Sequence, residues 1–459
     1  MDLSIMEYPS RSLRPYPVVV TSNTKGVDNP GWIKSAMTQD NVPRELREGR
    51  QRIDEGLSDD DDFELVEVLE NVVDEVLDQG ETDDEAEDDM EDVLGYEPSK
   101  DDALHTYSHH KGSVFASDIH PEGKIIASGG EDDRFILTEV PSGNILLDCN
   151  NYFQDSVTMV GFNHDGKYVF GCDMMGQIAV WKILPSGFSC VFKETVGGLT
   201  PSSWAKWHPK SNVLLIGGHS VWLYKIPSGQ CKLIHEGTTE TDSGDFMPDG
   251  KRAVIGFEDG TVKVVDLATG ATSCKFATES TQLSNILSVA VHPDNNLIAV
   301  GAMNSKLALF KTQQPKTVAV LDCAEEIQPL DQDGEEQDYV TSTEAALFVS
   351  VDGMNVLVVG TDHAVHVWDY TRLVLRHKIV VDDGVTRILW PENSLFIFVG
   401  TRLGTVNVYN ALSGEKQPSL EGHKSSILDM NLSSDKRHLI TAGDDGAVKM
   451  FDISQILQI

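Results

Sequence analysis

The sequence contains no hydrophobic run long enough to span a membrane. Hydrophobic residues make up 40% of the 459-residue chain, yet no apolar stretch approaches the roughly 18 residues that a spanning helix requires. The N-terminus, Met1-Asp2-Leu3-Ser4, lacks a basic start followed by an apolar stretch, so no secretory signal is expected. These absences predict a soluble protein without a membrane span.

Cysteine is scarce and scattered. The six cysteines lie far apart in the sequence and include no Cys-x-x-Cys pair. This spacing predicts neither a zinc site nor a disulfide framework, and it fits a reducing compartment. We therefore expect a cytoplasmic protein, with the nucleus as the alternative location.

Motifs that carry catalytic chemistry are also missing. The chain has no Gly-rich phosphate loop, no His-Glu-x-x-His, no Gly-x-Ser-x-Gly and no His/Cys cluster with metal-ligand spacing. No single pair of carboxylates stands out as an acid and a base. The sequence thus predicts no enzymatic activity, no cofactor and no metal.

Basic residues are few and unevenly placed. The chain has 36 Lys and Arg against 73 Asp and Glu, a formal net charge of −37. Residues 54–102 contribute −23, residues 1–53 contribute +2, and residues 103–459 contribute the remaining −16. Binding to nucleic-acid phosphates needs clustered Lys and Arg, so no direct nucleic-acid contact is expected. A basic protein is the better partner.

The first 102 residues lack the pattern of a folded domain. Residues 1–53 show no sustained periodicity and are predicted to be disordered, and residues 54–102 form an acidic, low-complexity arm. Within the arm, Leu65, Leu69, Val72 and Val76 recur at helical spacing. Two interpretations stay open: a nascent helix on a solvated arm, or a helix that folds against a partner.

From residue 103 onward, short strands repeat with a regular period. Each repeat has an apolar strand, an Asp-Gly or Pro-x-Gly turn, a strand that ends in Gly, and a third strand that ends near an aromatic or apolar residue. These closing positions are Thr138, Trp181, Tyr224, Val265, Phe310, Trp368, Tyr409 and Phe451. They lie 43, 43, 41, 45, 58, 41 and 42 residues apart. An acidic insertion, residues 324–338, accounts for the one long interval.

A period of about 40 to 45 residues with four strands per unit is typical of a WD-repeat β-propeller. The fold class is therefore all-β, with an eight-bladed WD-repeat propeller over residues 103–459. After the last third strand, near Asp452, only seven residues remain. We expect residues 103–108 to supply the outer strand of the eighth blade, which would close the ring and protect its edges.

Some recurring residues have structural explanations. His423, Asp445 and Trp368 occupy the loop, turn and closing positions of their repeats. Such residues are predicted to form a hydrogen-bonded brace inside a blade and not a catalytic pair.

The acidic residues fall at particular places in the repeat. In a four-stranded blade, the loop before the first strand and the turn between the second and third strands emerge on one face. The acids at these places are Glu131, Asp132, Asp133, Asp155, Asp173, Asp242, Glu258, Asp259, Asp362, Asp382, Asp383, Asp444 and Asp445. Any of them can be a turn former. As a set they predict a negative ring that binds a basic protein tail, more weakly as salt rises.

Three stretches resemble the angio-associated migratory cell protein family: 129–133 (Gly-Gly-Glu-Asp-Asp), 248–261 and 373–377. Trp207-His208-Pro209 is similar too, whereas Thr138 stands where the family tends to have Trp. The resemblance covers residues 103–459 and the acidic stretch before them.

This resemblance implies two functions. Animal members of the family are linked to cell migration and angiogenesis as intracellular signalling or cytoskeletal scaffolds. The family is also similar to a fungal eight-bladed propeller that chaperones a newly made large-subunit ribosomal protein by gripping its basic tail on an acidic face. The second function agrees with the charge pattern, so we rank a monomeric chaperone in ribosome biogenesis first and a scaffold second.

Overall fold

The computed structural model describes residues 97–196, 202–313, 315–324, 341–351, 353–381 and 383–458. The predicted disordered segment 1–53, most of the acidic arm and most of the insertion 324–338 lie outside these residues.

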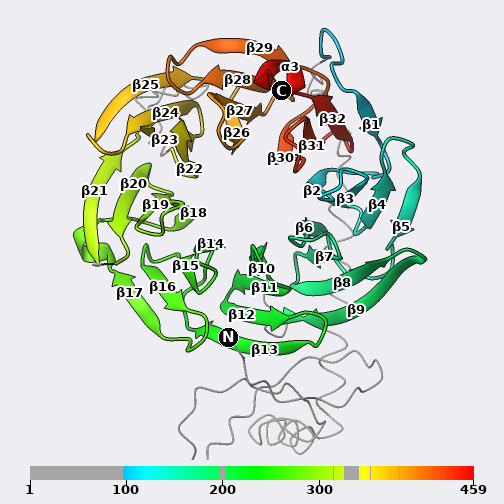
Figure 1. Cartoon of the computed structure of the whole chain (residues 1–459), viewed down its shortest axis with the longest axis horizontal. Coiled ribbons are helices and arrows are strands. Elements are labelled where there is room, and N and C mark those ends of the chain that lie inside the picture. Colours follow the sequence, from blue (N-terminus) through cyan, green and yellow to red (C-terminus); the bar gives the residue numbers. More distant parts are fainter. Residues whose placement is uncertain are drawn as a thin grey trace, which may run out of the picture. The chain divides into compact units, whose positions relative to one another are not determined.

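Eight four-stranded antiparallel sheets form the blades of a ring in the described part of the chain (Figure 1). The prediction of an eight-bladed propeller is confirmed. All eight predicted closing positions lie in the third strands of their blades. The first strands surround the centre of the ring and the fourth strands form its rim.

The first four blades follow one another along the chain. Blade 1 comprises β2 (Val114–Ile119), β3 (Ile125–Gly130), β4 (Phe135–Glu139) and β5 (Ile145–Asp148). Blade 2 comprises β6 (Val157–Phe162), β7 (Tyr168–Asp173), β8 (Gln177–Leu184) and β9 (Gly187–Thr195). Blade 3 comprises β10 (Ser202–Trp207), β11 (Val213–Gly218), β12 (Ser220–Lys225) and β13 (Gln230–Glu236). Blade 4 comprises β14 (Ser243–Phe246), β15 (Arg252–Gly256), β16 (Val262–Asp266) and β17 (Thr272–Phe276).

The last four blades complete the ring. A 3₁₀ turn, η2 (Thr278–Ser280), precedes blade 5, which comprises β18 (Ile286–Val291), β19 (Leu297–Ala302), β20 (Lys306–Lys311) and β21 (Lys316–Asp322). Blade 6 comprises β22 (Thr343–Val351), β23 (Met354–Thr361), β24 (Ala364–Asp369) and β25 (Val374–Val380). Blade 7 comprises β26 (Val385–Leu389), β27 (Phe396–Thr401), β28 (Val406–Asn410) and β29 (Lys416–Leu420). Blade 8 comprises β30 (Ile427–Leu432), β31 (His438–Gly443), β32 (Val448–Asp452) and β1 (His105–Tyr107).

The core lies between neighbouring blades. Second strands such as β7 are buried along their whole length, because each is covered by a blade on either side, and they are accordingly rich in apolar residues. Aromatic rings join adjacent blades: Phe135 stacks on Trp181 with centroids 4.7 Å apart, and Phe276 stacks on Phe310 at 4.2 Å. Burial between blades therefore holds the ring together and fixes where the connecting loops emerge.

The predicted ring closure is confirmed. β1 pairs with β32 in antiparallel register, with His105 opposite Met450 and Tyr107 opposite Val448. Just before β1, the Asp101 carboxylate accepts a hydrogen bond from Lys449 Nζ at 2.7 Å. The residues after β32 form a short helix, α3 (Ser454–Leu457). The two ends of the described chain thus meet in one blade.

Candidate functional site

A repeated backbone hydrogen bond brings two sets of loops onto one face of the propeller. In blade 1, the N–H of Glu131, after the second strand, donates to the carbonyl of Ser113, before the first strand, at 2.9 Å. The equivalent bonds in other blades are Met174–Ser156 (2.9 Å), Glu258–Glu240 (3.0 Å), Met303–Asn285 (2.8 Å), Arg402–Asp383 (3.2 Å) and Asp444–Ser426 (2.9 Å). We call the surface formed by these loops and turns the turn face.

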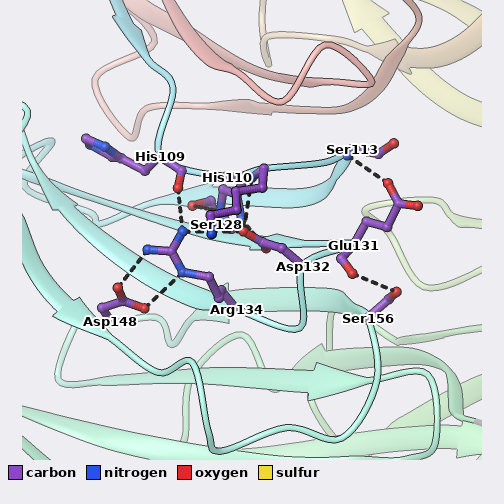
Figure 2. A network of polar contacts seen from close by, with 10 residues as sticks. His109, His110, Ser113, Ser128, Glu131, Asp132, Arg134, Asp148 and Ser156 are labelled. Carbon is purple, nitrogen blue, oxygen red and sulfur yellow. Dashed lines mark hydrogen bonds and ion pairs between the residues drawn. The ribbon is translucent and has the colours of Figure 1, made fainter.

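Four of the predicted acidic residues are exposed on the turn face. They are Glu131, Glu258, Asp259 and Asp444. Ser113 joins two of them across the boundary between blades 8 and 1: its N–H donates to Glu131 Oε2 at 3.1 Å and its hydroxyl donates to Asp444 Oδ1 at 2.6 Å. Figure 2 shows Glu131 beside Ser113 and Ser156. These carboxylates are available to a partner.

Four further predicted acids are half-buried: Asp133, Asp155, Asp242 and Asp383. The Asp242 carboxylate accepts a hydrogen bond from Asn285 Nδ2 at 2.6 Å, which links blades 4 and 5. Asp133 has a left-handed backbone with φ of 58°, a conformation that Asp tolerates better than most residues. Asp382 lies outside the described residues.

Two predicted site residues must be corrected, because their carboxylates are buried. Asp173 is 0% exposed and Asp362 is 7% exposed. The Asp173 carboxylate accepts backbone N–H groups of Gln154 and Gln177 at 3.2 and 2.7 Å, and burial raises its pKa above the usual value. The Asp362 carboxylate accepts the N–H and hydroxyl of Ser342. Both residues hold loops together and offer little to a partner.

The carboxylates of Asp132 and Asp445 also form hydrogen bonds inside their own blades. Asp445 bonds His423 Nδ1 at 2.9 Å, and the other ring nitrogen bonds Thr441 Oγ1 at 2.7 Å. Burial would raise the pKa of Asp445, but the hydrogen bond and charge interaction with His423, together with the backbone N–H groups of Lys424 and Ala447, outweigh burial, and the pKa lies below its usual value. Blade 1 repeats the arrangement with His110, Asp132 and Ser128 (Figure 2). The predicted brace is therefore present in blades 1 and 8.

The predicted role of tryptophan in this brace is wrong. Trp368 Nε1 is buried without a hydrogen-bond partner. In the two braced blades the closing residues are Thr138 and Phe451, so the third member is a hydroxyl of the second strand instead.

The turn face also carries bases, which the sequence prediction of a negative ring did not include. Lys111, Arg402 and Lys424 are exposed there. Lys424 pairs with Glu97 at 2.9 Å, so its charge is partly neutralised. Arg134 turns toward the rim, where it forms two hydrogen bonds with Asp148 at 3.2 and 2.7 Å (Figure 2). Lys111, Arg402 and Lys424 therefore reduce the net negative charge of the turn face in blades 1, 7 and 8.

Charged residues in the first strands form a second feature that sequence reasoning missed. Asp118 on β2 accepts the N–H of Phe162 in blade 2 at 2.7 Å. Asp429 on β30 accepts the N–H of Ser117 in blade 1 at 2.9 Å. Both carboxylates therefore link adjacent blades beside the central channel. The sequence signal is an acidic residue inside an otherwise apolar first strand.

Asp118 gives the protein a specific pH dependence. Burial, together with the nearby Asp429 carboxylate, raises the pKa of Asp118 to about 7. A raised carboxyl pKa means that the folded state holds the proton more tightly than the unfolded state, so this contribution to stability falls as pH rises from about 4 to about 7. Asp118→Asn cannot ionise. Its amide oxygen can accept the Phe162 N–H, while the Ile119 N–H loses its acceptor, a cost that does not change with pH.

We expect the unfolding free energy of Asp118→Asn, measured relative to that of wild type, to rise by about 1–2 kcal/mol between pH 5 and pH 8. The full pKa shift of a completely buried carboxyl would correspond to roughly 4 kcal/mol. The Asp118 side chain is only half-buried, so solvent screening reduces this effect. Urea unfolding across this range measures the difference. His235 and His366, with pKa values of about 4, titrate equally in both proteins. Their contributions therefore cancel in the difference between variant and wild type. Asp165→Asn is the control, since the pKa of Asp165 is about 2. A constant difference across the range would contradict the expectation.

Two absences among the described residues bear on other functions. None of their helices is long and apolar enough to cross a membrane. Nor do they contain a group of three or more His, Cys, Asp or Glu side chains arranged to hold a metal ion.

Comparison with known proteins places the chain among WD-repeat proteins. Residues 102–137 and 414–452 match the family "WD domain, G-beta repeat". The angio-associated migratory cell protein of Homo sapiens is 31% identical over 369 residues, which cover 79% of this chain and 83% of the human protein. The ribosome assembly protein SQT1 of Saccharomyces cerevisiae is 24% identical over 386 residues, covering 77% and 87%.

Solved structures share the same fold. The crystal structure of Chaetomium thermophilum Sqt1 bound to the N-terminus of the ribosomal protein L10 superposes with a TM-score of 0.66 at 20% identity, covering 77% of this chain and 100% of that one. The fold agrees with the eight blades described above, and the similarity to the human sequence extends over most of the propeller. This chain therefore belongs to the angio-associated migratory cell protein family.

Proposed function

We propose that this protein is a chaperone that holds the basic tail of a newly made large-subunit ribosomal protein on the turn face of its propeller. The observation that carries this proposal is the exposure of Glu131, Glu258, Asp259 and Asp444 on one face of the ring. Residues 103–459 have a net charge of −16, so the field around the propeller attracts a cationic chain.

Exposed ion pairs are individually weak, and this weakness suits a partner that binds only temporarily. One exposed pair contributes only about 0.2–1 kcal/mol, so several carboxylates spread over the turn face must act together. Their combined attraction is weakened by salt and by competition from a stronger polyanion. Ribosomal RNA is such a polyanion, and a tail held by many weak pairs can be transferred to it without chemical energy.

The relatives support the same interpretation. The S. cerevisiae relative is a ribosome assembly protein, and the C. thermophilum neighbour is bound to the N-terminus of a ribosomal protein. The human relative's name refers to migrating cells, which favours an intracellular scaffold as the second candidate. The two candidates differ in what the turn face must bind.

Affinity purification of the full-length protein from lysate at low salt tests the proposal. We expect one basic large-subunit ribosomal protein to dominate the eluate, to elute with moderate salt and to be accompanied by no mature large subunits. Partners that stay bound at high salt and include no ribosomal protein would contradict the chaperone proposal and favour the scaffold.

A further inference from the structure

A cavity of about 350 Å³ lies at the mouth of the central channel. Its walls come from the first strands of five blades, which surround the centre of the ring (Figure 1), and from a turn of blade 7. The lining includes Phe115 on β2, Leu428 on β30 and Arg402 in the turn between β27 and β28. Because Arg402 belongs to the turn face, the cavity lies on the side of the ring where the exposed acids are found.

The cavity differs from its surroundings in chemistry. Phe115 and Leu428, which are half-buried, supply its apolar surface, and Thr158 and Thr386 add hydroxyl groups. Its volume is near the lower end of the range of about 300–1,000 Å³ for ligand pockets. A hollow with both apolar and polar walls, in the middle of a charged face, is suited to a side chain that anchors a flexible partner.

Two guanidinium groups border this hollow, although the face around it is acidic. Arg387 is 52% exposed, and its Nε lies 3.7 Å from Asp429 Oδ1. The Arg402 side chain packs against Gly384, where an added Cβ would lie 3.0 Å from its Cδ. With Glu344 as the remaining charged residue of the lining, the lining residues have a net charge of +1, and Asp429 beside Arg387 offsets part of it.

This charge distribution disfavours two classes of occupant. A lysine or arginine side chain would meet two positive groups in the cavity, and an anionic group would be repelled by the surrounding acids of the turn face. A neutral aromatic ring meets neither penalty. It gains apolar contact with Phe115 and Leu428, and a guanidinium over its face adds a cation–π interaction of about 0.5–2 kcal/mol.

We infer that the channel mouth is a binding pocket for an aromatic side chain carried by the basic partner segment. This inference rests on the proposed function and narrows it: the acids of the turn face attract the basic residues, and the pocket selects a segment with an aromatic residue among them. Charge then sets how strongly affinity depends on salt, and the pocket contributes affinity that salt does not remove.

Two peptides test the inference with the full-length protein. The probe is a short arginine-rich peptide with a single tryptophan, and its twin has alanine at that position. Each carries the same dye, and fluorescence anisotropy gives Kd over a range of salt concentrations. We expect the tryptophan peptide to bind about 10-fold more tightly than its twin, with the same slope of log Kd against log salt.

Variants locate the contact. Phe115→Ala and Arg402→Gln should each reduce the difference between the two peptides. Leu403→Ala should preserve it, since Leu403 follows Arg402 and is 42% exposed but does not line the cavity. Arg402 is exposed, so its variant tests the pocket even if Phe115→Ala fails to fold.

The outcomes separate this inference from the proposed function. Equal, salt-sensitive binding of both peptides to wild type would overturn the aromatic pocket and leave the acidic chaperone standing. A tryptophan advantage that Arg402→Gln and Phe115→Ala leave intact would overturn the pocket as well. Failure of both peptides to bind would overturn the proposed function and the pocket together.

Discussion

Reversing three charges on the turn face, with Glu131→Lys, Glu258→Lys and Asp444→Lys combined, should weaken binding of a basic ribosomal tail by about 100-fold. Each substitution removes an attraction of about 0.2–1 kcal/mol and adds a repulsion of similar size, and about 3 kcal/mol in total corresponds to two orders of magnitude in Kd. The three carboxylates are exposed. Asp259 is left intact because its carboxylate closes its own turn by accepting the N–H of Thr261 at 2.8 Å, whereas Glu131 and Asp444 accept their hydrogen bonds from Ser113 in a neighbouring loop.

A matched variant controls for the change in net charge. Glu122→Lys, Glu392→Lys and Glu415→Lys make the same change on the opposite face, where these exposed residues lie in or next to turns between other strands. Titration of a labelled basic tail at several salt concentrations compares the two triple variants. The turn-face variant should also show a shallower salt dependence. Equal loss in both variants would mean that overall charge, and not the turn face, drives binding.

The architecture could be predicted from the sequence because each blade repeats the same local requirements. Turns such as Asp259-Gly260-Thr261 need a glycine with positive φ: Gly260 has φ of +75°, and an added Cβ would lie 2.1 Å from the carbonyl oxygen of Leu283. Closing residues such as Trp181 and Phe310 are buried between blades, so they recur once per blade and their spacing gives the length of the repeat. Closure of the ring by residues 103–108 could be predicted because too few residues follow the last third strand to form a fourth strand of the eighth blade.

The site residues were harder to predict, since an aspartate in a turn looks the same in sequence whichever way its carboxylate points. Asp444 faces solvent and its neighbour Asp445 bonds His423. Asp173 instead accepts backbone N–H groups from two loops. The orientation depends on whether a second loop offers donors nearby, which is a tertiary property.

The channel mouth was beyond sequence reasoning for a related reason. Phe115 and Leu428 lie more than 300 positions apart in the chain, and they line one cavity only because blades 1 and 8 are neighbours in the closed ring. An arginine in a first strand, such as Arg387, has no distinguishing pattern around it. Its importance comes from convergence with Arg402 from a different part of the same blade.

Closure of the ring should depend strongly on Tyr107. Its side chain is 5% exposed and packs with Ile440, Val448 and Met450 of blade 8, and its strand is only three residues long. Replacing a large buried aromatic by alanine costs about 3–5 kcal/mol, a large share of the 5–15 kcal/mol that stabilises a typical domain. Tyr107→Ala should therefore lower the urea midpoint markedly and expose residues 97–108 to proteases.

Tyr107→Phe separates packing from hydrogen bonding at this position. The Tyr107 hydroxyl is buried without a partner, and removing an unsatisfied polar group avoids its desolvation cost of about 1–3 kcal/mol. The phenylalanine variant should thus unfold at the same or a higher urea concentration than wild type. If Tyr107→Ala instead matches wild type in both urea and protease resistance, β1 does not hold the ring closed, and the interfaces between neighbouring blades suffice without it.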